Sequence, residues 1–220
     1  MIRLKHALFA LTLPLAGCYG ASATVVDTGP APTVQQAQAA PYDGPQKRIA
    51  VTAFEFRAGE GSSQIGEGMS DMLTNALFNT GKFIVLERER LNEVMEEQDR
   101  ANSDRFKKET AAPKGQLEGA ELLIRGSVIQ FESKCRGGSI IIAAGSEACM
   151  AINLRIIEAK TGRVVNATTV EGTSGKSRVG ILFSGGSLPV GLGTYSNTPM
   201  EAAIRNCIEA AVQHIAATKL

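Results

Sequence analysis

The 220-residue chain has two histidines and no tryptophan, and this scarcity limits the chemistry it can perform. His6 lies in an N-terminal leader, so the mature chain keeps His214 alone. A serine-histidine-aspartate triad or a histidine-based zinc site needs more than one such residue. We therefore expect no enzyme, no catalytic residue, no metal and no cofactor.

Phosphate-binding and carboxylate chemistry also lack their usual patterns. The glycines at 59, 61, 66 and 68 are not followed by the Lys-Ser/Thr of a phosphate loop. Glutamates between 87 and 97 alternate with arginines, as on a solvated helix. We expect no nucleotide-binding site and no paired catalytic carboxylates.

The N-terminal apolar run is too short for a membrane span, which needs roughly 20 residues. Arg3 and Lys5 precede an uncharged core that ends in Leu15-Ala16-Gly17-Cys18. This lipobox predicts a signal peptide over 1–17, cleaved between Gly17 and Cys18, with Cys18 lipidated. A plain secretory signal is the alternative. Position 19 is Tyr, and the absence of Asp after the lipidated cysteine resembles bacterial lipoproteins that are sent to the outer membrane. It predicts an outer-membrane lipid anchor facing the periplasm.

Charge gives no reason to expect a nucleic-acid partner. The whole chain has 23 basic and 22 acidic residues, and removal of 1–17 leaves 21 and 22, a formal charge of −1. Residues 18–45 are rich in Ala, Pro, Gln and Thr without hydrophobic periodicity, which predicts a flexible or extended linker. One domain is then expected over 46–220.

The domain alternates strand and helix patterns before it becomes strand-rich. Residues 48–54 and 83–86 are predicted strands, and apolar residues recur at helical spacing over 65–77 and on one face of 88–99. Strands are predicted over 122–131, 151–158 and 163–170, and a final helix over 199–217. The pattern predicts an α/β fold, a mixed sheet flanked by helices, with the final helix covering the sheet.

Two Gly- and Ser-rich apolar segments interrupt the strand-rich half, near 134–150 and 175–195. One interpretation is that each segment is a mobile loop or a covered hairpin. The other is that both segments contact lipid or a neighbouring subunit, because exposed apolar stretches of this kind often mark such contacts. The candidate membrane residues are Ile140, Ile141, Ile142, Ile181, Leu182, Phe183, Leu188 and Val190.

Three cysteines remain after Cys18. Cys135 and Cys149 flank the first apolar segment and could face one another across a hairpin, as a disulfide or as two thiols. Cys207 falls near the apolar face of the last helix, where a buried thiol acts as a small hydrophobic group.

An ordered series of blocks resembles the CsgG family of outer-membrane lipoproteins, the curli production assembly and transport components. The blocks are Arg48-Ile-Ala-Val, Met72-Leu-Thr-Asn-Ala-Leu, Phe83-Ile-Val-Leu-Glu-Arg, Gly126-Ser-Val-Ile-Gln-Phe-Glu, Ile152-Asn-Leu-Arg-Ile-Ile, Thr161-Gly and Ser196-Asn-Thr-Pro. The resemblance implies a periplasmic domain that forms a ring, nonameric in the family. Two hairpins per subunit would join those of neighbours in one transmembrane barrel.

That resemblance implies a homo-oligomeric pore that secretes curli-type or other extracellular fibre or adhesin proteins, with periplasmic accessory proteins as further partners. The apolar segments look shorter than the hairpins of curli exporters, and 140–144 is apolar on both faces. Residues 57–64 have none of the Tyr, Asn or Phe that narrow the curli channel. The alternative is a periplasmic scaffold or binding lipoprotein that keeps the fold without the pore.

Overall fold

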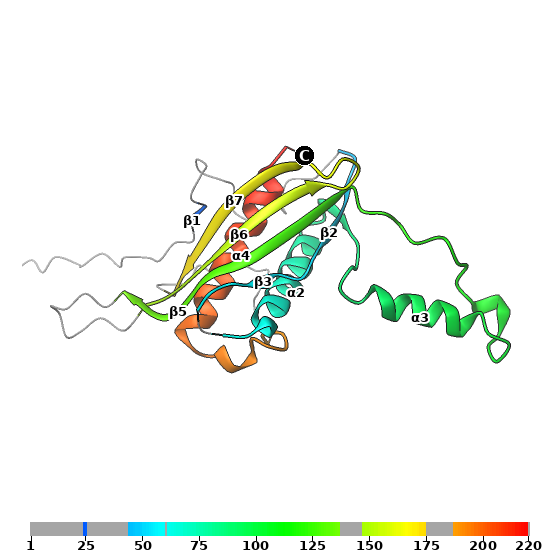
Figure 1. The fold of residues 1–220 in the computed structure, drawn as a ribbon, viewed down its shortest axis with the longest axis horizontal. Helices are drawn as coiled ribbons and strands as arrows, with labels where there is room; N and C mark the ends of the chain where they lie inside the picture. The colour runs from blue at the N-terminus through cyan, green and yellow to red at the C-terminus, as the bar shows by residue number, and fades with distance from the viewer. Residues whose placement is uncertain (1–23, 26–43, 60, 137–146, 175–186, 220) are drawn as a thin grey trace, which may run out of the picture.

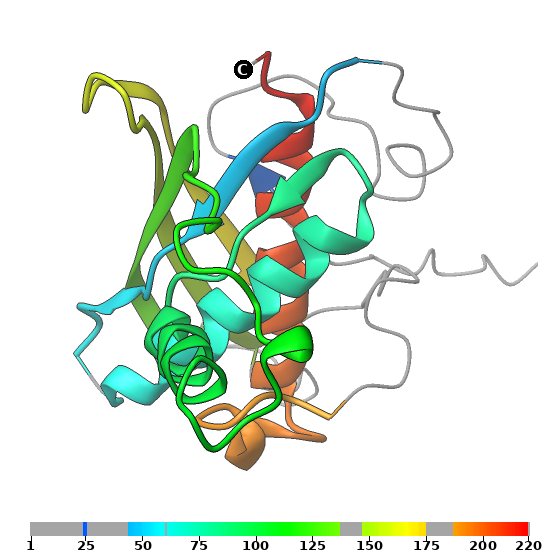
Figure 2. The same cartoon turned by 90° about the vertical axis from the view of Figure 1, so that its right-hand side faces the viewer.

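The domain is a two-layer arrangement of one mixed sheet with two long helices on one of its faces (Figures 1 and 2). The computed structural model describes residues 24–25, 44–59, 61–136, 147–174 and 187–219. Its strands are β1 (Thr24–Val25), β2 (Lys47–Val51), β3 (Glu55–Phe56), β4 (Phe83–Val85), β5 (Leu122–Arg136), β6 (Glu147–Glu158) and β7 (Val164–Thr173). Its helices are α2 (Ser63–Asn79), α3 (Leu91–Ala101), α4 (Pro199–Ala217) and the short η1 (Lys108–Thr110) and η3 (Gly193–Tyr195).

The sheet joins a parallel half to an antiparallel half. Its order is β1-β7-β6-β5-β2-β4, and β3 pairs with β5 beside β2. The strand β2 pairs in parallel with β4 and with β5, and β3 pairs in parallel with β5. Long connections that contain helices separate the two strands of each pair, as parallel pairing requires. The strands β5, β6 and β7 pair antiparallel. The predicted α/β class and mixed sheet are confirmed.

The helices α2 and α4 supply the apolar layer that covers the sheet. All the periodic apolar residues predicted for 65–77 are buried, and so is the apolar face of α4. Gly81 follows the C-terminal cap of α2 and turns the chain toward β4. Its φ is positive, at 66°, a conformation that glycine adopts without strain. The final helix occupies the predicted range and covers the sheet as expected (Figure 2).

Glu201 stabilises the start of α4. Its carboxylate accepts a hydrogen bond from the backbone N–H of Asn197 at 2.6 Å and pairs with Arg205 at 2.7 Å. The Asn197 hydrogen bond, followed by the Arg205 interactions, lowers the pKa of Glu201 below its usual value despite the opposing effect of burial. Glu201 therefore keeps its charge to a lower pH than an ordinary glutamate.

Two elements differ from the sequence expectations. Inside the predicted linker, β1 pairs with β7, which would otherwise present unpaired backbone groups at that side of the sheet. The helix α3 forms near its predicted range, but none of its residues is buried. Figure 1 draws α3 apart from the sheet and from α2 and α4, so its apolar positions do not join the core.

Candidate functional site

The strand residues that flank the first apolar segment and those that precede the second lie at one end of the sheet. Pairing of β5 with β6 continues to Arg136 opposite Glu147, the residues on either side of 137–146. The strand β7 ends with Thr173 opposite Cys149, just before 175–186. Ser174 then donates its backbone N–H to the carbonyl of Ala148 at 2.9 Å. The strand residues directly before the two segments therefore lie at the same end of the sheet, where β5, β6 and β7 are neighbours.

Cys135 and Cys149 lie at the base of the first segment. The structure joins them in a disulfide, with Cα atoms 5.7 Å apart and positions 14 apart in the sequence. This crosslink holds the ends of β5 and β6 together at the place where the chain leaves the sheet.

We predict that reduction of this disulfide, or Cys135→Ser with Cys149→Ser, lowers the free energy of unfolding by about 3 kcal/mol, because the short loop is no longer closed in the unfolded chain. Urea unfolding of protein purified from an oxidising compartment measures this loss. Non-reducing peptide mapping should recover the linked pair, with Cys207 as the internal reference for a free thiol. Two free thiols at 135 and 149 would contradict the assignment.

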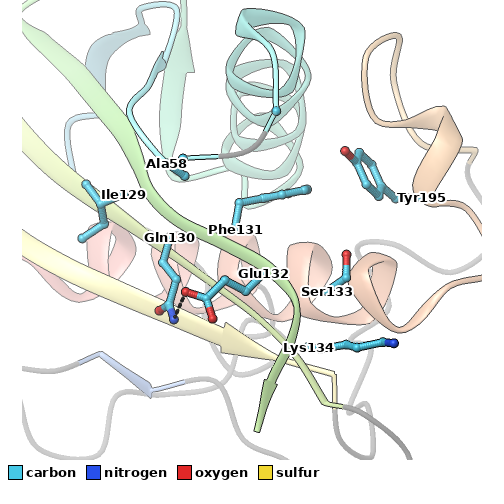
Figure 3. Close-up of a pocket in the computed structure, with 10 residues that line it drawn as sticks. Ala58, Ile129, Gln130, Phe131, Glu132, Ser133, Lys134 and Tyr195 are labelled. Atoms are coloured by element: carbon cyan, nitrogen blue, oxygen red, sulfur yellow. Dashed lines mark hydrogen bonds between the residues drawn. The ribbon is translucent and has the colours of Figure 1, made fainter. Parts of the chain in front are cut away.

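A surface hollow of about 600 Å³ opens at the same end of the sheet (Figure 3). Its walls are the loop after β3, the exposed part of β5 and the turn before α4; they include Ala58, Gly59, Gly61, Ile129, Gln130, Phe131, Glu132, Ser133, Lys134 and Tyr195. Phe131 packs edge-on against Tyr195, with ring centroids 5.0 Å apart. The mixed lining suits contact with protein chain better than enclosure of a small ligand.

Phe56 extends this aromatic contact. Its ring lies 6.1 Å from that of Phe131, also edge-on, while Phe54 is buried in the core. Phe56 is partly buried and packs against that core. Tyr195 was not singled out from the sequence, although it stands immediately before the Ser196-Asn-Thr-Pro block.

The sequence-predicted membrane residues fall in different parts of the chain. Ile140, Ile141, Ile142, Ile181, Leu182 and Phe183 lie outside the described residues, as do Gly17 and Cys18. Val190 is 87% exposed. Leu188 is 7% exposed and belongs to the hydrophobic core, so the expectation that it faces lipid is corrected: its side chain packs inside the domain.

Cys207 and His214 are both core residues of α4. Burial raises the pKa of the Cys207 thiol far above its usual value, which disfavours the thiolate needed for reactivity. His214 is buried with Nε2 2.9 Å from Oδ1 of Asn166. In the described ranges, no His, Cys, Asp and Glu side chains are grouped as metal ligands would be.

The sheet face away from α2 and α4 carries a charged group that the sequence analysis missed. Glu55 accepts hydrogen bonds from Arg125 and, at 2.9 Å, from Nε of Arg57. The hydrogen bond from Arg125, followed by that from Arg57, lowers the pKa of Glu55 below its usual value. Arg155 lies directly across from Arg125 in the β5–β6 register. The alternation of charged and apolar residues in both strands indicated an exposed face, but only the register brings the arginines together.

Among the residues that the structure describes, no helix combines the length and the apolar character needed to cross a membrane.

Several solved structures are similar to this chain at low identity. The hypothetical protein CT253 from Chlamydia trachomatis has 10% identity and a TM-score of 0.49, over 78% of this chain and 96% of that one. The PelC dodecamer from Paraburkholderia phytofirmans has 16% identity and a TM-score of 0.42, over 86% and 94%. Lipoprotein GNA1162 from Neisseria meningitidis has 18% identity and a TM-score of 0.36, over 63% and 90%. These values are too low to support an argument about function.

Comparison with curated protein sequences gives no match. The model of one family, described as the curli production assembly/transport component CsgG, matches residues 32–220. The match spans most of the chain and confirms the family predicted from the sequence blocks. The chain belongs to the CsgG family.

Proposed function

We propose that this chain is a lipid-anchored subunit of a homo-oligomeric outer-membrane pore that exports extracellular fibre or adhesin proteins. Cys18 carries the lipid, and residues 19–45 connect it to a domain on the periplasmic side. The family description, an assembly and transport component, supports a transport role rather than an enzymatic one. Outer-membrane lipid, further copies of the chain, the secreted subunits and periplasmic accessory proteins are its partners.

The observation that supports this proposal most strongly is the common exit of the two apolar segments. The strand residues directly before 137–146 and 175–186 lie at one end of the sheet, where β5, β6 and β7 are neighbours. Two hairpins entering a membrane from a rigid domain need this arrangement, because both must reach the same surface. The disulfide between Cys135 and Cys149 fixes the base of the first hairpin.

Membrane insertion would then depend on assembly. A single pair of hairpins has unpaired backbone groups at its edges, and each such group costs several kcal/mol in hydrocarbon. Hairpins from neighbouring subunits remove this cost by pairing with those edges. The candidate membrane residues of the proposed pore are Ile140, Ile141, Ile142, Ile181, Leu182 and Phe183, and those on one side of each strand would face lipid.

The second candidate function is a periplasmic scaffold that keeps the fold without a pore. The shortness of the two segments favours it, since a membrane-spanning strand needs roughly 9–11 residues. In that case the apolar segments and the hollow beside Tyr195 contact a partner protein instead of lipid.

Conductance through planar lipid bilayers distinguishes the two functions. The lipidated full chain is expected to produce channels. Of the two variants Ile140→Arg and Ile141→Arg, the one that places arginine in lipid is expected to reduce channel formation at least tenfold. Successive strand residues face opposite sides, so one of the two positions faces lipid. Arginine at the bilayer midplane costs about 2–4 kcal/mol per subunit.

The matched control is Val164→Arg, because Val164 is an exposed apolar residue at the other end of β7. Channels should form normally with this variant. A wild-type protein without conductance, or wild-type conductance in both the Ile140→Arg and Ile141→Arg variants, would favour the scaffold.

A further inference from the structure

The helix α3 buries no side chain against the described part of its own chain. It is 11 residues long, contains no buried residue and has no side-chain hydrogen bond at its N-cap. Helices shorter than about 12–15 residues are marginal alone in water and depend on packing for their stability. Figure 1 shows α3 projecting from the body, and Figure 2, viewed from that side, shows it in front of the other elements. The helix is therefore available to a partner.

The charge of α3 indicates what that partner must offer. Four carboxylates and one arginine lie within Leu91–Ala101. Glu97 pairs with Arg100 at 2.7 Å, and Asp99 pairs with Lys114 at 2.6 Å. No ion pair is described for Glu93 or Glu96, which are three residues apart and share one helix face. We call Glu93 and Glu96 the acidic face of α3.

The sheet face away from α2 and α4 has the opposite charge, with more arginines than carboxylates. Arg57, Arg125 and Arg155, which we call the arginine cluster, line a hollow of about 170 Å³ with Glu55 as its one carboxylate. Arg125 and Arg155 are directly opposite one another on β5 and β6, a placement that destabilises an isolated sheet. Glu55 pairs with Arg57 and Arg125, and no ion pair is described for Arg155.

We propose that the acidic face of α3 in one subunit binds the arginine cluster of the next subunit. This inference deepens the proposed function and rests on it. Each surface lacks the charge that the other has in excess, and both occur on every copy of the chain. Since the two surfaces lie at different places, the contact is head-to-tail, and head-to-tail contacts produce rings when the rotation closes. The packing that α3 lacks in one chain is then supplied by a second copy.

Charge reversal tests the contact in the lipidated full chain in mild detergent, by mass photometry across a concentration series. Arg155→Glu is expected to raise the concentration at half-assembly about tenfold, and so is the pair Glu93→Arg with Glu96→Arg. A chain with all three changes restores opposite charges and should recover most of the lost association. Arg163→Glu, the same charge change in the exposed turn before β7, should assemble like wild type.

The outcomes separate this contact from the pore itself. Weaker association in each charge-reversal variant, with recovery of association in the chain that carries all three changes, supports the contact. Circular dichroism checks that each variant is folded. Assembly that is unchanged by the reversals, or loss without recovery, overturns the contact and leaves the pore proposal standing. A wild-type chain that does not assemble overturns both.

Discussion

Replacing Gly172 with alanine is expected to lower the free energy of unfolding by about 3 kcal/mol. Gly172 is buried in β7, where α4 crosses the sheet. A Cβ atom at this position would lie 2.3 Å from the carbonyl oxygen of Ala203 and 2.6 Å from the backbone nitrogen of Cys207. Both are backbone atoms of α4, so the helix itself would have to move.

Thermal and urea unfolding measure this effect, and the melting temperature should fall by roughly 6–12 °C. Gly119→Ala is the matched control, since nothing lies within 4 Å of a Cβ built there. It should change stability by no more than about 0.5 kcal/mol. A Gly172→Ala protein as stable as wild type would contradict the close contact between α4 and β7.

Replacing Cys18 with alanine is expected to move nearly all of the protein from the membrane fraction to the soluble periplasm. Several acyl chains anchor a protein stably, whereas one chain alone binds only marginally. Because an uncleaved leader could itself hold the protein, residues 1–17 are replaced by a secretory signal in the variant. Fractionation and mass spectrometry of the mature N-terminus provide the measurement.

Cys207→Ala is the control for the loss of a cysteine, because Cys207 is buried in the core and far from the lipobox in sequence. That variant should stay in the membrane fraction. Continued membrane association of the Cys18→Ala protein after carbonate washing would mean that the apolar segments, rather than a lipid, hold the chain there.

Local sequence pattern was enough to predict the elements whose burial follows a simple period. The helical spacing of Ile65, Met69 and Leu73 marks α2, and the alternation in 151–158 marks most of β6. These residues pack against the core wherever the neighbouring strands lie, so their pattern is visible without the tertiary structure. Gly172 lies beyond the strand predicted over 163–170, so its close approach to α4 was not predicted.

The features that local sequence pattern could not predict depend on strand register and on contacts between residues far apart in the sequence. The pairing of β1 with β7 comes from a segment with no hydrophobic periodicity. Arg125 and Arg155 meet only because β5 and β6 pair with a particular offset. Leu188 resembles the apolar segment before it, yet its contacts place it in the core. The same limit applies to α3, whose amphipathic pattern predicted its helix but not that none of its residues is buried against the described chain.

Negative-stain electron microscopy of the lipidated protein, extracted from outer membranes in mild detergent, tests the central claim most directly. We expect large rings with a central opening, formed by one repeated subunit. Uniform small particles of single subunits would contradict the pore and direct the search toward a periplasmic partner protein.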